Sequence, residues 1–208
     1  LRAAGQVKIG IMFPMISSFD EFMEAKGIVL SCVENLRKRG QPIPEHLKIG
    51  LMVELPSVLE VLEDLAQEAD FFSVGTNDFI QYMLAVDRTN TRVAELFDHL
   101  DPSVLRALQQ VQQQCQPLGV ELSLCGEMAS DPAAALLLVG LGFKQLSLAA
   151  HQIPKIKWLI QSVSQQQAAE LVEECLQMKS AQEIRARTDQ ALVDLGLGRL
   201  AKVAVDAD

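Results

Sequence analysis

Basic side chains are scarce in this sequence: 18 Lys and Arg stand against 27 Asp and Glu, which gives 208 residues a formal net charge of −9. Proteins bind nucleic-acid backbones through clustered Lys and Arg, so this charge balance argues against a nucleic-acid-binding surface. An anionic ligand would therefore need local help from a metal ion or from a few arginines.

The sequence also lacks paired cysteines, clustered histidines and any apolar run long enough to cross a bilayer. Four widely spaced cysteines indicate neither a disulfide framework nor a zinc site. With no secretory segment, we expect a cytoplasmic protein that does not bind a membrane. Hydrophobic residues make up 49% of the chain, which is enough for a sizeable core.

Short apolar runs alternate along the chain with segments of helical periodicity. The apolar runs predict strands at residues 7–15, 48–54, 71–75, 121–125 and 144–148. Cap residues and periodicity predict helices near residues 17–39, 56–67, 103–114, 132–142, 154–162, 165–175 and 181–195. A long polar connection is expected after residue 75, and a loose tail at 195–208.

This alternation is typical of parallel strands joined by crossover helices, in an open doubly wound sheet or a closed eight-stranded barrel. Successive strands start roughly every 35 residues, so a complete barrel would need on the order of 280 residues. Residues 1–5 look like the end of a helix without its beginning. We therefore expect an α/β chain that is part of a TIM (β/α)8 barrel, with about five βα units present and the first three strands missing.

Three of the predicted strands lead directly into reactive groups, namely Glu54, Asp78 and Cys125. In barrels of parallel strands the chemistry lies at the carboxyl ends of the strands. Any one of these residues could be an ordinary polar residue at a junction between strand and loop. Three at equivalent positions predict a shared site.

Four segments resemble the phosphoenolpyruvate-binding barrel of enzyme I of the bacterial phosphotransferase system, the phosphoenolpyruvate-protein phosphotransferases. They are IMFPM at 11–15, MVELPS at 52–57, FFSVGTNDFIQYMLAVDR at 71–88 and LCGEMASDP at 124–132, in the same order and at similar spacing. Pyruvate phosphate dikinase and phosphoenolpyruvate synthase share GTND, but the form CGEMASDP favours enzyme I. General similarity of the C-terminal part favours the nitrogen-regulatory branch.

The resemblance implies that Glu54 and Asp78 are magnesium ligands, which suits a hard cation that prefers oxygen. It implies that Asn77, Asp78 and Arg88 bind the substrate, with Asn77 on its phosphate. The alternatives are a salt bridge at the rim for Glu54, turn geometry for Asn77 and a solvated surface position for Arg88. Arg92 lies outside the family pattern and receives no role.

Cys125 matches the family's catalytic acid, which delivers a proton to the methylene carbon of enolpyruvate. A thiol suits this role because both of its protonation states are accessible near neutral pH. Gly126 is expected to allow close backbone approach, and Glu127 to support the site. The other cysteines, Cys32, Cys115 and Cys175, are expected to be packing residues.

The parent enzyme implied by the resemblance is a homodimeric transferase. It passes the phosphoryl group of phosphoenolpyruvate to a histidine in a separate N-terminal domain and on to a histidine phosphocarrier protein, and it releases pyruvate. None of the three histidines here lies in a phosphohistidine context. The matching barrel also draws two phosphate-binding arginines from its earlier strands. We therefore expect residues 1–208, the C-terminal portion of that barrel with added helices from about residue 165, to be inactive alone.

Two other functions stay open at this point. One is a different magnesium-dependent phosphoenolpyruvate or pyruvate barrel enzyme, such as a dikinase, synthase, pyruvate kinase or lyase, which would need no carrier protein. The other is a non-catalytic dimerisation module, suggested by the very apolar predicted helix AAALLLVGLG at 133–142. The segment after Gln165 is amphipathic and is expected to cap the barrel rather than to recruit a partner.

Overall fold

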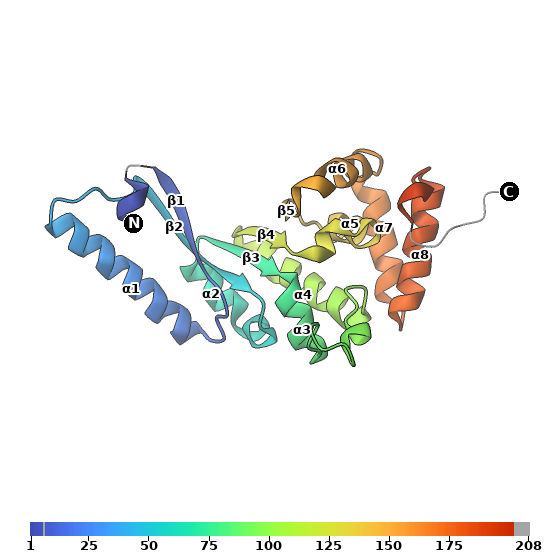
Figure 1. Cartoon of the computed structure of the whole chain (residues 1–208), viewed down its shortest axis with the longest axis horizontal. Coiled ribbons are helices and arrows are strands. Elements are labelled where there is room, and N and C mark those ends of the chain that lie inside the picture. The colour runs from blue at the N-terminus through green and yellow to red at the C-terminus, as the bar shows by residue number, and fades with distance from the viewer. Residues whose placement is uncertain (6, 202–208) are drawn as a thin grey trace.

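The computed structural model describes residues 1–5 and 7–201, and within them five parallel strands alternate with helices (Figure 1). The strands are β1 (Lys8–Phe13), β2 (His46–Val53), β3 (Phe71–Gly75), β4 (Glu121–Cys125) and β5 (Leu146–Ser147). They form one sheet in the order β1-β2-β3-β4-β5. This order never reverses, as in a barrel and unlike a doubly wound sheet, so the predicted five βα units are confirmed.

The helices also follow the prediction closely. They are α1 (Phe19–Lys38), α2 (Leu62–Glu68), α3 (Thr76–Leu84), α4 (Pro102–Leu118), α5 (Pro132–Gly140), α6 (Ile153–Gln161), α7 (Gln165–Leu176) and α8 (Ala181–Asp194). Short 3₁₀ turns are η1 (Arg2–Ala4), η2 (Pro56–Val61), η3 (Ala94–Leu96), η4 (Glu127–Ser130), η5 (Ala150–Gln152) and η6 (Gly198–Leu200). Ser18 caps α1 by accepting the Glu21 N–H, and Asp131 caps α5 by accepting the Ala133 N–H.

Parts of the prediction were wrong, apart from element ends that shift by a few residues. The predicted polar connection after residue 75 begins with helix α3, because Phe79 and Ile80 bury their side chains and hold the segment against the core. The predicted helix at 56–67 starts as the 3₁₀ turn η2 after Pro56. The predicted tail at 195–208 contains η6, and residues 202–208 lie outside the described part of the chain.

The two faces of the sheet differ sharply. Phe72 and Val74 of β3 point to one face and are fully buried. The other face, called the inner face below, carries Phe71, Ser73 and Cys125, because side chains alternate along a strand and β3 pairs with β4 in register. A Cβ added at Gly50 would collide with the Phe71 carbonyl oxygen and would lie 2.9 Å from its ring, so glycine on β2 lets the backbone and ring of Phe71 approach closely.

The apolar helix α5 is buried inside the chain, with residues 133–138 no more than 1% exposed. It packs against α7, and Gly140 lets the two helices approach closely beside the Ala168 backbone. Helix α7, in the amphipathic segment after Gln165, therefore covers α5, and the prediction that this segment caps the barrel stays a prediction. Because residues 133–138 of α5 are buried inside the chain, packing within the chain explains this apolar stretch, which therefore no longer points to a dimerisation module.

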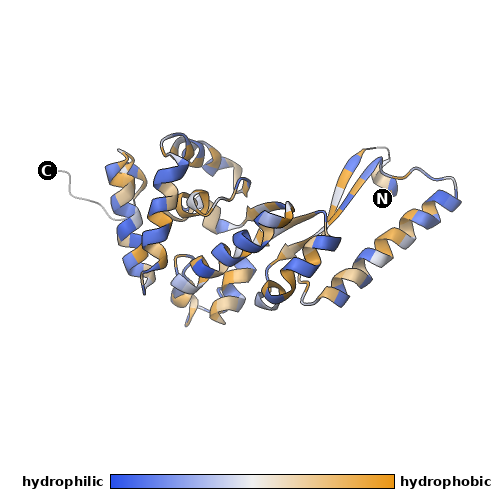
Figure 2. Cartoon of the chain, turned by 180° about the vertical axis from the view of Figure 1, so that it is seen from behind, coloured by the Kyte–Doolittle hydropathy of each residue, from blue (hydrophilic) through white to orange (hydrophobic). Residues whose placement is uncertain are grey.

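In residues 1–5 and 7–201, every helix is too short or too polar to cross a lipid bilayer. The four cysteines are free thiols. Cys115 and Cys175 are buried, as expected for packing residues, but Cys32 is exposed on α1, so that part of the expectation was wrong. Figure 2 shows hydrophobic residues interspersed with hydrophilic ones along α1, where Ile28 and Leu30 are 60% and 50% exposed.

Candidate active site at the carboxyl end of the sheet

The predicted site residues gather where the parallel strands end. Glu54 directly follows β2, Asp78 lies in the first turn of α3 after β3, and Cys125 is the last residue of β4. Gly75 and Cys125 are register partners on neighbouring strands. The strand ends therefore bring two carboxylates and a thiol to one rim.

Glu54 is an unusually buried carboxyl group, with only 2% of the residue exposed. Burial raises its pKa, the Met15 N–H donated to Oε1 at 2.5 Å opposes this rise, and the nearby Asp78 charge raises the pKa further. Across residues 1–5 and 7–201, no Lys, Arg or His forms an ion pair with either carboxylate. The two negative groups thus face each other without a protein cation.

A divalent cation fits this pair of carboxylates. A Cβ at Gly75 would lie 2.7 Å from Met52 Sδ and 3.0 Å from Glu54 Oε2, so glycine at this position lets both side chains lie against the end of β3. The described ranges hold no group of three or more His, Cys, Asp and Glu side chains suited to a metal. Magnesium is commonly held by one or two carboxylates plus water and substrate phosphate, so Glu54 and Asp78 match that donor set.

The GTND and CGE turns interlock at the rim. Thr76 Oγ1 donates to the Cys125 carbonyl at 2.9 Å, and the Glu127 N–H donates to Asn77 Oδ1 at 3.1 Å. Gly126 has a φ of 121°, and a Cβ there would collide with Thr76 Oγ1. The expected close approach at Gly126 is confirmed. With Oδ1 engaged, the amide nitrogen of Asn77 is the group that can donate to a ligand.

Arg88 reaches the same turn from the segment after α3. Its Nη1 lies 3.9 Å from Glu127 Oε1, and 38% of its side chain is exposed. Such a long, exposed ion pair is weak, so the guanidinium can exchange Glu127 for an anionic ligand at little cost. Arg88 is therefore neither buried in the core nor isolated from the rim.

Sequence reasoning missed the partner of the Cys125 thiol. Ser73 Oγ lies 3.7 Å from Cys125 Sγ, and Ser73 is 7% exposed. The signal was available in the alternation of FFSVG, which puts Ser73 and Gly75 on one face of β3.

A buried ion pair behind the site was also missed. Arg185 of α8 binds Asp131 with two hydrogen bonds, Nη1 to Oδ1 at 3.0 Å and Nη2 to Oδ2 at 2.8 Å. His99 Nε2 lies 2.9 Å from Asp131 Oδ2. Asp131 follows η4, the turn after Cys125, so the C-terminal helix α8 helps to hold the turn that follows the thiol.

Comparison with known proteins gives a consistent result. The family described as "PEP-utilising enzyme, PEP-binding domain" matches residues 1–165. Proteins named "Phosphoenolpyruvate-dependent phosphotransferase system" from Salmonella typhimurium and Escherichia coli are each 39% identical over 202 residues, which is 96% of this chain and 27% of theirs. A "Phosphoenolpyruvate-protein phosphotransferase" from Bacillus subtilis is 40% identical over 89% of this chain and 33% of its own length.

The chain thus spans about a third or less of the length of these relatives. A solved citrate lyase from Burkholderia xenovorans has a similar fold, with a TM-score of 0.54 and 20% identity over 97% of this chain and 70% of that one. At this identity the likeness speaks for the fold alone.

Proposed function

This chain belongs to the PEP-utilising enzymes, whose PEP-binding domain it matches, and we propose that it forms part of the active site of a phosphoenolpyruvate-protein phosphotransferase. In the proposed reaction the intact protein passes a phosphoryl group from phosphoenolpyruvate to a histidine of a separate domain and on to a phosphocarrier protein. Pyruvate is released. The observation that carries the proposal is the meeting of Glu54, Asp78 and Cys125 at one rim.

Glu54 and Asp78 would hold a magnesium ion, which would supply positive charge to the substrate phosphate and to the enolate that forms when the phosphoryl group leaves. Asn77 would donate from its amide nitrogen to the phosphate. Arg88 would grip phosphate or carboxylate through two N–H groups of its planar guanidinium. An acidic protein can bind an anion at this rim because these positive and neutral donors gather there.

Cys125 would give a proton to the methylene carbon of enolpyruvate and take it back in the reverse direction. Its half-buried position suits this role better than the buried positions of Cys115 and Cys175. Burial raises the pKa of Cys115 to about 12 and the pKa of Cys175 to about 11, so both stay protonated and unreactive at neutral pH.

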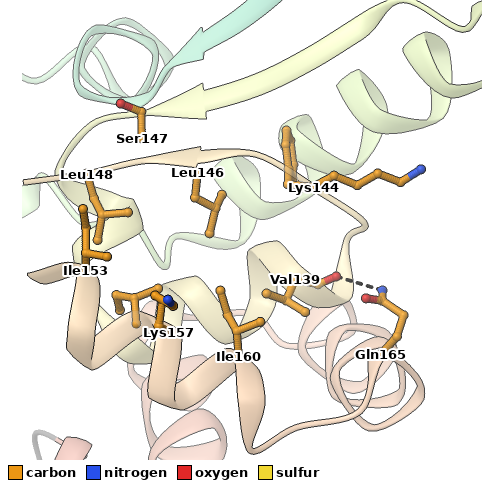
Figure 3. Close-up of a pocket in the computed structure, with 11 residues that line it drawn as sticks. Val139, Lys144, Leu146, Ser147, Leu148, Ile153, Lys157, Ile160 and Gln165 are labelled. Carbon is orange, nitrogen blue, oxygen red and sulfur yellow. Dashed lines mark hydrogen bonds between the residues drawn. The ribbon is translucent and has the colours of Figure 1, made fainter.

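The edges of the sheet support the proposal that it continues into further βα units of a larger barrel. Beyond β5, a cavity of about 700 Å³ lies between this strand and α6, and Figure 3 shows Leu146, Ile153 and Ile160 directed toward it. Ile153 and Ile160 are 42% and 40% exposed. At the other edge, Met12 of β1 is 37% exposed. A neighbouring parallel strand at each edge would cover such apolar side chains.

A phosphorylation assay with the intact protein tests the proposal. Phosphoenolpyruvate carrying a labelled phosphoryl group should label the intact protein and then an added histidine phosphocarrier protein, and it should do so only with magnesium. Turnover of phosphoenolpyruvate to pyruvate at the same rate with and without a carrier would contradict the proposal and favour another enzyme of the family.

The proposal includes three further properties that the resemblance implies for the intact protein. They are a homodimeric state, a cytoplasmic location and membership of the nitrogen-regulatory branch. Sedimentation of the intact protein tests the first, since a monomer at micromolar concentration would contradict it.

A further inference from the structure

We propose that Ser73 is a positioning residue that aims the thiol of Cys125 and stabilises the negative charge on its sulfur. The inference rests on the proposed function in one respect: the proton transfer proposed for Cys125 is the reason why its thiol must point in a defined direction. The contact itself stands on geometry: Ser73 Oγ and Cys125 Sγ are 3.7 Å apart on the inner face of the sheet.

The sheet itself brings these two groups together. Gly75 and Cys125 are register partners, and Ser73 lies two residues before Gly75, on the same face of β3. Ser73 is only 7% exposed as a residue, so little water competes with Cys125 for its hydroxyl. The two strands fix both Cα positions, so the contact does not depend on a mobile loop.

The backbone of Cys125 is held separately. Thr76 Oγ1 donates to its carbonyl oxygen at 2.9 Å, and Gly126 packs against Thr76. With the backbone fixed, the direction of the sulfur depends on a single side-chain rotation about χ1. Ser73 selects the rotamer in which the sulfur stays on the inner face, beside the rim that carries Glu54.

A hydroxyl suits a sulfur that alternates between two protonation states. In the proposed protonation step the S–H bond breaks and its electron pair stays on sulfur, while the enolate electron pair forms the new C–H bond with that proton. The Ser73 hydroxyl can accept from the thiol before the step and donate to the thiolate after it, because it is both donor and acceptor. No further reactant is needed.

Ser123 provides a matched control in the same sheet. It is the register partner of Ser73 on β4, but its hydroxyl donates to the Phe72 carbonyl at 3.3 Å instead of to the thiol. Ser73→Ala and Ser123→Ala therefore remove the same group from neighbouring positions on one face, and only the first removes the partner of Cys125.

Alkylation of Cys125 by iodoacetamide, followed by peptide mass spectrometry, tests the inference without turnover. At pH 8 we expect Ser73→Ala to slow modification of Cys125 about two- to threefold, because losing one hydrogen bond lowers the thiolate fraction up to about fivefold while the more basic thiolate that remains reacts about twofold faster. Ser73→Thr keeps the hydroxyl and should restore the rate, and Ser123→Ala should leave it unchanged. The charged rim groups Glu54, Asp78, Arg88 and Glu127 are the same in every variant, so the difference reports the hydroxyl.

Two outcomes would overturn the inference. One is an unchanged or faster reaction of Cys125 in Ser73→Ala, and the other is an equal slowing in Ser123→Ala. Circular dichroism of each variant confirms that the sheet is intact. Failure of the proposed function would look different: the intact protein would not phosphorylate a carrier, whereas the alkylation rates would still distinguish Ser73 from Ser123.

Discussion

Replacing Arg185 with Met should destabilise the protein by about 3 kcal/mol, because it leaves the Asp131 carboxylate buried without its cation. Asp131 is 8% exposed, the Arg185 side chain is 19% exposed, and two hydrogen bonds of 3.0 and 2.8 Å join them. Removing one partner of a buried pair costs about 3–5 kcal/mol. We expect the lower end of this range of destabilisation, because His99 and the Ala133 N–H still contact the Asp131 carboxylate.

Urea unfolding and thermal unfolding measure this loss. For a chain of this size, about 3 kcal/mol corresponds to a fall in the melting temperature of about 6–12 °C. Arg187→Met is the matched control on the same helix: Arg187 pairs with Glu174, and the two side chains are 32% and 52% exposed. An exposed pair contributes about 0–1 kcal/mol, so the control should melt within about 4 °C of the wild type.

The double variant Asp131→Asn with Arg185→Met completes a double-mutant cycle for this ion pair. It removes the buried charge along with its partner, so it should be more stable than Arg185→Met alone. If Arg185→Met destabilises no more than Arg187→Met does, the buried pair does not hold α8 against the loop after Cys125, and the reasoning is refuted.

Three further predictions concern the thiols, the rim arginine and the interlocked turns. Iodoacetamide at about pH 8.5 should leave Cys115 and Cys175 unmodified in the folded protein, because burial raises their pKa values to about 12 and about 11. Since the folded state holds those protons more tightly than the unfolded state, stability measured in urea should fall as the pH rises above about 8.5, and a rise instead would refute the assignment. Arg88→Gln should raise the KM of the intact protein for phosphoenolpyruvate about 10–100-fold, because it removes hydrogen bonds to a charged group of the substrate. Arg92→Gln is the neighbouring control, and an equal rise in KM in both variants would exclude a specific role for Arg88. Gly126→Ala should lower the free energy of unfolding by about 1–3 kcal/mol, because φ is 121° at Gly126 and Thr76 Oγ1 occupies the space that the new Cβ would need. Gly27→Ala is the control: Gly27 lies in helix α1 with open space around it, so this change should be neutral or stabilising in the same measurement.

Local pattern was enough to predict most of the fold. The strands FFSVG and VELSLC and the cap at Asp131 carry their own signals, and the structure has them where expected. The segment TNDFIQYML was harder, because a helix that starts directly after the last residue of a strand leaves no loop to separate the two periodicities. The core covers the apolar side chains of Phe79 and Ile80, and this tertiary packing stabilises the helix.

The site shows the same division. Glu54, Asp78 and Cys125 could be placed together from sequence because strand ends of a parallel sheet share one edge. The contact between Arg185 and Asp131 could not, since 54 positions separate them and only the packing of α8 brings them together. Ser73 was partly predictable. Strand alternation predicts which face of β3 it occupies, but predicting its distance from the Cys125 sulfur requires the register of β3 with β4.

Magnesium-dependent exchange of the methyl protons of pyruvate with solvent, measured in the intact protein by NMR, tests the central claim most directly. The account predicts that Cys125→Ala slows this exchange by at least about 100-fold, the usual loss when a proton-transfer group is removed. Glu54→Gln should also slow the exchange, because it removes a proposed ligand of the cation that stabilises the enolate, whereas Glu63→Gln on the exposed side of α2 should leave it unchanged. Exchange at the wild-type rate in both Cys125→Ala and Glu54→Gln would contradict it.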